Sequence, residues 1–149
     1  MKRFVALRPV LALALLVPMA SCAMNPATGE RQLMLVSEQQ EIRMGQQGAE
    51  QVRATIGLVQ DRALQDYVSE IGLAMARDTE RPDLPWSFQV VDDPVVNAFA
   101  LPGGPVFVTR GILAYFGSEA ELAMVLGHEA GHITARHSAE QMSRQQLYG

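Results

Sequence analysis

The stretch from Ser118 to His132 reads SEAELAMVLGHEAGH, and it predicts a helix that carries two histidines on one face. Ser118 followed three residues later by Glu121 has the form of a capping box, which opens a helix. His128 and His132 are four residues apart, about one helical turn, so both imidazoles can reach one metal ion. Glu129 projects near the same face, where it can take a proton from an attacking water. This pattern is typical of zinc-assisted hydrolysis.

A plainer interpretation is a pair of exposed or capped histidines on an ordinary amphipathic helix. Gly127 and Gly131 lie beside the histidines, and each costs about 1 kcal/mol relative to alanine inside a helix. Close approach of a neighbouring element beside a metal would explain them, and so would simple helix packing. The sequence leaves both explanations open.

The helix is expected to continue to about Gln146, and this limits which other residues could bind the metal. Glu121 and Glu140 lie seven and eight residues from the nearer histidine. At 1.5 Å per residue a straight helix holds both too far away. His137 follows the second histidine by five residues, so we expect it to contact a ligand, pack or lie exposed rather than bind the metal.

The residue patterns in the rest of the chain predict an α+β fold. Helical spacing covers residues 37–56, opened by a capping box at Ser37, and residues 61–77, capped by Asp61. Alternating or extended runs then predict three strands, and a short helix follows them. These strands cover residues 86–90, 95–101 and 106–109, and the short helix covers 111–116. We expect the strands to form a small antiparallel sheet.

The first 21 residues are expected to be a lipoprotein-type signal peptide. Lys2, Arg3 and Arg8 precede an apolar run over residues 10–17 that is short for a membrane span. Small residues then lead to Cys22, the single cysteine of the chain, as in the lipobox of bacterial lipoproteins. A plain signal peptide that leaves a free thiol is the alternative. Residues 22–36, rich in turn-forming residues, are expected to be a tether.

Charge argues against nucleic acid as a partner. The chain has 12 basic and 16 acidic residues. Removing residues 1–21 takes away three of the basic residues and leaves nine, so the net charge falls to −7. The remainder contains no lysine, and phosphate binding depends on clustered lysine and arginine.

Three separate stretches resemble the zinc metalloendopeptidases of the CAAX prenyl protease and HtpX type, and within them the BepA and LoiP type. Residues 25–42 contain NPATG, QLM and SEQQEI, similar to that group's N-terminal signature. Residues 97–111 contain NAFALPGG and VTRG, similar to the strand-turn-strand before its active helix. Residues 127–137, GHEAGHITARH, complete the resemblance.

The resemblance implies a site with one zinc ion. His128 and His132 would bind the zinc and Glu129 would act as general base. The strand Asn97, Ala98, Phe99 and Ala100 would be the edge on which an extended substrate lies, although a hairpin needed only for folding is an equal alternative. The third ligand, a glutamate, is expected beyond Gly149. Residues 37–149 would then be an incomplete zincin-like (minigluzincin) domain, truncated at the C-terminus.

The function implied by the resemblance is proteolytic quality control in the bacterial envelope. The substrates would be unfolded or misassembled envelope proteins, and lipidated Cys22 would anchor the chain to the periplasmic leaflet of the outer membrane. The alternative is a non-enzymatic envelope lipoprotein that binds client proteins. Because two histidines alone should hold zinc weakly, we expect the 149 residues by themselves to be inactive.

Overall fold

The fold is organised around β5 (Pro105–Thr109), a strand that is buried along its whole length. It pairs in parallel with β3 (Ser87–Val91) and antiparallel with β4 (Ala98–Ala100), which gives the strand order β3-β5-β4. The computed structural model describes residues 22–24, 29, 31–33 and 35–148. Within these residues, β4 has no strand on its outer side.

The predicted strands are present, but the prediction of a fully antiparallel sheet is wrong. A turn joins β4 to β5 through Gly103 and Gly104, whose φ values of 76° and 132° favour glycine. This turn makes the two strands an antiparallel hairpin. β3 pairs with the opposite side of β5 and runs parallel to it. Alternation along a strand indicates which side chains are buried, but it carries no information about which neighbour the strand chooses.

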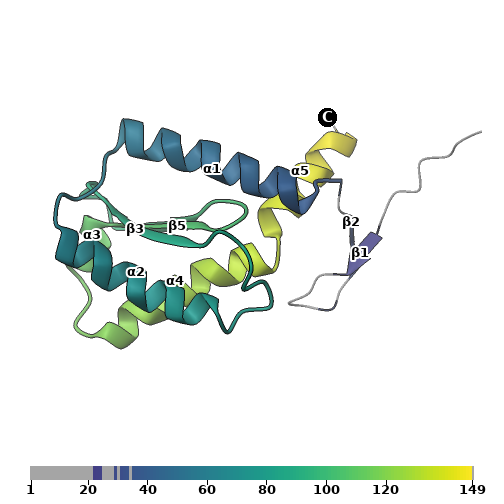
Figure 1. The fold of residues 1–149 in the computed structure, drawn as a ribbon. Coiled ribbons are helices and arrows are strands. Elements are labelled where there is room, and N and C mark those ends of the chain that lie inside the picture. Colours follow the sequence, from purple (N-terminus) through teal and green to yellow (C-terminus); the bar gives the residue numbers. More distant parts are fainter. Residues whose placement is uncertain (1–21, 25–28, 30, 34, 149) are drawn as a thin grey trace, which may run out of the picture.

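Helices cover both faces of the sheet (Figure 1). α1 (Glu38–Thr55) lies on one face, where Ala49 meets Val91 and Phe107. α2 (Arg62–Ala76) and α4 (Glu119–Thr134) lie on the other face and share its core. The buried members of this larger cluster are Val68, Ala76, Leu84, Phe88, Val90, Val106, Val108, Leu122, Leu126 and Ile133. α2 packs mainly against β3, whereas α4 lies beside the edge strand β4.

The helix starts agree with the predicted caps. Ser37 forms a complete capping box at α1, and the Asp61 side chain accepts a hydrogen bond from the backbone of the first turn of α2. Ser118 caps α4 in the same way. The second half of that predicted box differs, because the Glu121 carboxylate accepts from the backbone N–H of Gly117 at 2.6 Å. A short helix, α3 (Arg110–Leu113), precedes this cap.

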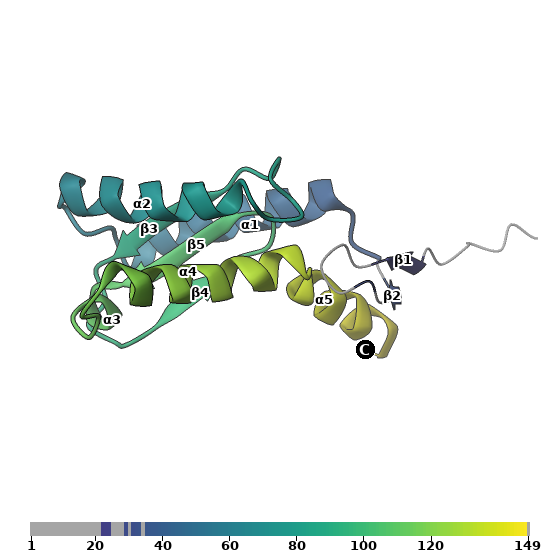
Figure 2. The ribbon, with the colours of Figure 1, turned by 90° about the horizontal axis from the view of Figure 1, so that it is seen from below.

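The prediction of one continuous helix to residue 146 is wrong. α4 ends at Thr134, and a separate helix, α5 (His137–Tyr148), leaves in a new direction (Figure 2). The break falls at Arg136, which has a φ of 56° and is the one non-glycine residue with positive φ among those described. Helical periodicity continues through this position, so the cause of the break is tertiary.

The segment expected to be a tether contains two short strands in the structure. β1 (Cys22–Met24) and β2 (Arg31–Leu33) pair antiparallel, and β2 lies against α5. The predicted signal peptide, residues 1–21, lies outside the described residues.

At the other end of the molecule, Tyr67 of α2 donates a hydrogen bond to Glu119 of α4 at 2.8 Å, and this bond raises the pKa of the Tyr67 phenol.

Candidate metal centre and active site

The two histidines of α4 converge on one point. His128 and His132 lie one turn apart and are both exposed, and their Nε2 atoms are 3.1 Å apart. A tetrahedral zinc ion bound to two imidazole nitrogens at ordinary distances would separate those nitrogens by about 3.3 Å. The spacing of the two nitrogens therefore fits two positions of a zinc site. The predicted one-turn spacing accounts for this geometry.

Glu129 is half-buried beside the histidines and lines a groove of about 410 Å³. α4 forms one wall of the groove, and the segment that enters β4 forms the other. Apolar side chains make up most of the lining. Its residues are Val96, Asn97, Ala98, Ile112, Met124, Val125, His128 and Glu129. A peptide lying in this groove would pass directly by the carboxylate.

The four residues predicted to bind substrate do not all face the groove. Asn97 and Ala98 line it. Phe99 faces the other side of the sheet, where its ring stacks on Phe107 with centroids 5.3 Å apart. Ala100 packs against the larger core cluster. The four residues form one continuous stretch of backbone at the edge of the sheet, from Asn97 through β4. A substrate that contacts all four would therefore contact their main chain.

The start of β4 is held in place by Thr109 at the end of β5. The backbone N–H of Thr109 donates to the Asn97 carbonyl at 3.0 Å, and the Asn97 N–H donates to the Thr109 hydroxyl oxygen at 3.2 Å. Thr109 is buried and also caps α3. Sequence reasoning did not single it out, because a strand-ending threonine has no local signature of this role.

His137 contacts the second histidine from the far side of its ring. The Nδ1 atoms of His132 and His137 are 2.8 Å apart, while Nε2 of His132 points to His128. His137 therefore touches a candidate ligand without reaching the point where a metal would sit. The continuous helix used to argue that His137 does not bind the metal is absent, so that expectation stays a prediction.

A buried ion cluster holds the bend between α4 and α5. Glu41 of α1 is 1% exposed, and its carboxylate accepts from Arg136 at 3.1 Å and from Arg81 at 2.9 Å. Arg136 also donates to the Val36 carbonyl, and Arg81 donates to the Ile133 carbonyl at the end of α4, both at 3.0 Å. Glu41 and Arg136 are 95 residues apart, so no local pattern could have revealed the pair.

The two glycines beside the histidines differ. A Cβ at Gly127 would lie 2.8 Å from Cε of Met75, so helix packing by α2 accounts for this glycine. A Cβ at Gly131 would meet nothing within 4 Å, and Gly131 is exposed. Within the described residues, therefore, packing explains one glycine and leaves open space beside the other.

A third metal ligand is not found in the part of the chain that the structure describes. No group of three His, Cys, Asp or Glu side chains there is placed to hold a metal ion. Glu121 and Glu140 were excluded as ligands on the assumption of a straight helix. The bend after Thr134 does not add either of them to the histidine pair. Glu140 of α5 pairs with Arg144 at 2.7 Å, and Glu121 accepts from Gly117.

Comparison with known proteins identifies the family. The model described as Peptidase family M48 matches residues 62–148, which is more than half of the chain. This chain belongs to peptidase family M48. The expected resemblance to the zinc metalloendopeptidases is thereby confirmed at the level of the family.

The M48 chain is similar to named proteases from bacteria and fungi. It is 36% identical over 111 residues to the beta-barrel assembly-enhancing protease of Yersinia pestis, covering 74% of this chain and 23% of that protein. It is 33% identical over 107 residues to the protein of the same name in Escherichia coli K12, covering 72% and 22%. The mitochondrial metalloendopeptidase OMA1 of Schizosaccharomyces pombe is 40% identical over 124 residues, covering 79% and 36%. The matched region thus spans only 22% to 36% of the length of these relatives.

Proposed function

We propose that this chain carries the catalytic part of a zinc-dependent endopeptidase with a zincin-like core. The observation that supports this most directly is the convergence of His128 and His132, with Nε2 atoms 3.1 Å apart, beside Glu129 in a groove bordered by an edge strand. Membership of peptidase family M48 supports the same reaction. A non-catalytic pair of exposed histidines would not need a carboxylate and a groove at the same place.

The residues divide the chemistry between them. His128 and His132 would hold the zinc ion, which supplies Lewis acidity toward a peptide carbonyl when bound. Glu129 would take a proton from the attacking water as the water oxygen bonds to the carbonyl carbon. It would then hand that proton to the amine nitrogen, so that the C–N bond breaks and the amine leaves. The backbone of β4 would hold the substrate extended by strand pairing, and the apolar groove would receive its side chains.

The third ligand would come from outside the described residues. A catalytic zinc ion uses three protein ligands and leaves its fourth position open. The described part of the chain offers two. By the resemblance, a glutamate outside the described residues would supply the third.

The substrates proposed are unfolded or misassembled proteins of the bacterial envelope. The names of the Yersinia pestis and Escherichia coli relatives link those proteins to β-barrel assembly. An edge strand that pairs with the substrate backbone, together with an apolar groove, suits unfolded segments. Neither feature requires a particular substrate sequence at most positions. The predicted lipobox would place the chain on the periplasmic side of the outer membrane. Among the described residues, no helix is long and apolar enough to cross a membrane.

Replacing Glu129 with Gln tests the reaction. The amide keeps the size of the side chain but cannot take a proton, so the kcat of peptide hydrolysis by the full-length protein should fall by about 10²–10⁴-fold. Zinc content should not change. Glu70→Gln on the exposed face of α2 is the matched control and should retain full activity. Hydrolysis by Glu129→Gln at the rate of the unaltered protein would contradict the assigned base.

The same experiment separates the enzyme from a protein that only binds clients. The presence of just two candidate ligands in the described residues is the observation that favours the alternative. In that case Glu129→Gln would bind unfolded β-barrel proteins as well as the unaltered protein does, and neither would hydrolyse them at any zinc concentration.

Lipidation of Cys22 is tested by Cys22→Ser in a Gram-negative host. The unaltered protein should incorporate a labelled fatty acid and fractionate with the outer membrane, because two or more acyl chains make anchoring stable. The variant should incorporate no label and appear in the soluble periplasmic fraction. Equal labelling of both proteins would rule out Cys22 as the site.

A further inference from the structure

We propose that His137 is a positioning residue that fixes the proton of His132 on Nδ1 and so presents Nε2 to the zinc ion. This inference rests on the zinc site of the proposed function. A neutral imidazole carries its proton on one nitrogen only, so a histidine that binds metal through Nε2 must hold the proton on Nδ1. Histidine ligands are usually oriented by an acceptor for that proton. His137 Nδ1, at 2.8 Å, is placed to be this acceptor.

The bend between α4 and α5 brings His137 into reach. In a straight helix, five residues amount to a rotation of about 140°, so His137 would face away from His132. In the structure Arg136 adopts a φ of 56°, the helix breaks, and the two rings come together with centroids 5.1 Å apart. The contact therefore exists only because the backbone leaves the helix at this residue.

Arg136 is held in this conformation by polar anchors in α1 and just before it. Its guanidinium binds the buried carboxylate of Glu41 at 3.1 Å and the carbonyl of Val36 at 3.0 Å. A second anchor lies further along α5, where the Leu35 N–H donates to the buried Ser143 hydroxyl at 3.0 Å. α1 thus sets the direction of α5, and with it the position of His137.

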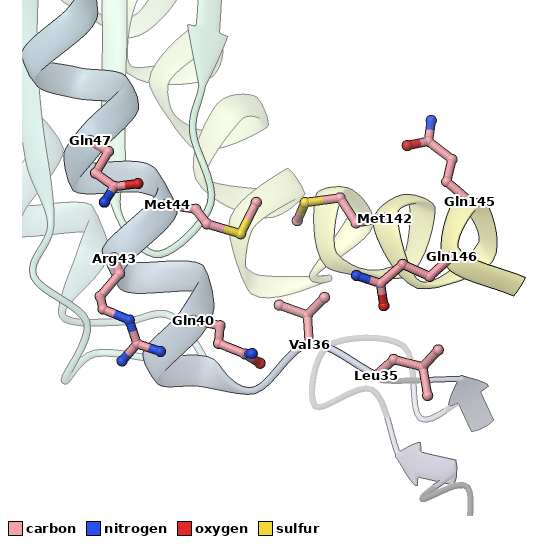
Figure 3. A pocket seen from close by; sticks show the side chains of 9 residues that line it. All are labelled: Leu35, Val36, Gln40, Arg43, Met44, Gln47, Met142, Gln145 and Gln146. Atoms are coloured by element: carbon pink, nitrogen blue, oxygen red, sulfur yellow. The ribbon is translucent and has the colours of Figure 1, made fainter. Parts of the chain in front are cut away.

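Apolar packing alone would not hold α5 there. A groove of about 590 Å³ lies between α1 and α5, with Met44 and Met142 extending toward one another across it (Figure 3). The other lining residues are mostly glutamines. His137 itself is exposed, so it is not kept in place by burial. The polar anchors at Arg136 and Ser143 therefore contribute to the placement of α5.

Zinc affinity of the full-length protein is the first test, measured by competition with a chromophoric chelator. His137→Ala should bind zinc 10–100-fold more weakly, the range found when such partners are removed. His137→Asn should recover most of the affinity, because its Oδ1 occupies nearly the position of Nδ1 and accepts the same proton. Arg62→Gln, in an exposed pair with Asp66, is the control and should bind zinc normally.

A double-variant comparison tests the link through Arg136. Arg136→Gly retains easy access to positive φ but loses the contacts to Glu41 and Val36, so it should weaken zinc binding to a similar degree. If both residues act through one contact, the double variant with His137→Ala should be no weaker than the poorer single variant. If the two losses of zinc affinity multiply in the double variant, Arg136 acts independently of His137. That result would overturn the proposed link from Arg136 through His137 to His132.

Nitrogen-15 NMR of the imidazole rings provides a readout that does not depend on activity. In the zinc-loaded protein, His132 should show a protonated Nδ1 that exchanges slowly with solvent, and His137→Ala should make that exchange fast. Equal zinc affinity and equally slow exchange in His137→Ala would overturn the inference.

Failure of the zinc site would look different. If His128→Ala binds zinc as tightly as the unaltered protein, the proposed function is wrong. The metal-free protein then shows whether His132 and His137 are hydrogen-bonded. If they are, His137→Ala should change the nitrogen-15 chemical shifts of both ring nitrogens of His132. Unchanged shifts would show that the hydrogen bond is absent.

Discussion

Arg136 shows how much one residue can decide. Its backbone lies in the left-handed region, which costs a non-glycine residue about 1–2 kcal/mol, and its guanidinium binds Glu41 and Val36. The strain is tolerated because these contacts are made only when the chain bends. By contrast, the close approach of His128 and His132 depends on one turn of regular helix, which is why spacing alone predicted it.

The two glycines of α4 should respond differently to alanine. Gly131→Ala should raise the free energy of unfolding by about 0.5–1 kcal/mol in urea titrations, because the helix is stiffened and the new Cβ meets no atom within 4 Å. Gly127→Ala is the control and should gain less, since its Cβ would press on Met75 at 2.8 Å. Destabilisation by Gly131→Ala would indicate that a further segment occupies this space.

At the scale of elements, α1 is joined to both ends of the α4–α5 bend by a single carboxylate. Glu41 binds Arg136, which starts the turn into α5, and Arg81, which holds the last turn of α4 through the Ile133 carbonyl. The helix caps were predictable because they are local, and the sheet order and the bend were not, because both depend on partners distant in the chain.

Glu41→Gln should be strongly destabilising. Removing one partner of a buried ion pair typically costs about 3–5 kcal/mol, because the remaining charges stay buried without compensation. Glu38→Gln is the matched control. Glu38 also contacts Arg81 at 2.9 Å, but its side chain is 60% exposed, so the cost should be at most about 1 kcal/mol. Equal losses in thermal or urea unfolding would show that Glu41 does not anchor the bend.

In the molecule as a whole, the described part of the chain brings together a groove and two of the proposed zinc ligands. A polypeptide of residues 22–149 should bind zinc weakly and show no proteolysis that depends on Glu129, because a catalytic zinc ion needs three protein ligands. Zinc titration and a peptide cleavage assay measure both quantities.

Efficient, Glu129-dependent cleavage by residues 22–149 alone would contradict this prediction. It would mean that two histidines suffice or that a third donor lies closer than the structure indicates.

Local residue patterns were enough to predict the helices and their caps, the strands, the histidine pair with its glutamate, and the family resemblance. All of these depend on residues within a few positions of one another, or on short motifs that can be compared directly. Contacts between distant segments instead set the parallel pairing of β3 with β5, the orientation of Phe99 away from the groove, and the bend at Arg136 that brings His137 to His132. These features follow from strand neighbours and from a buried ion pair across 95 residues, which no local periodicity encodes.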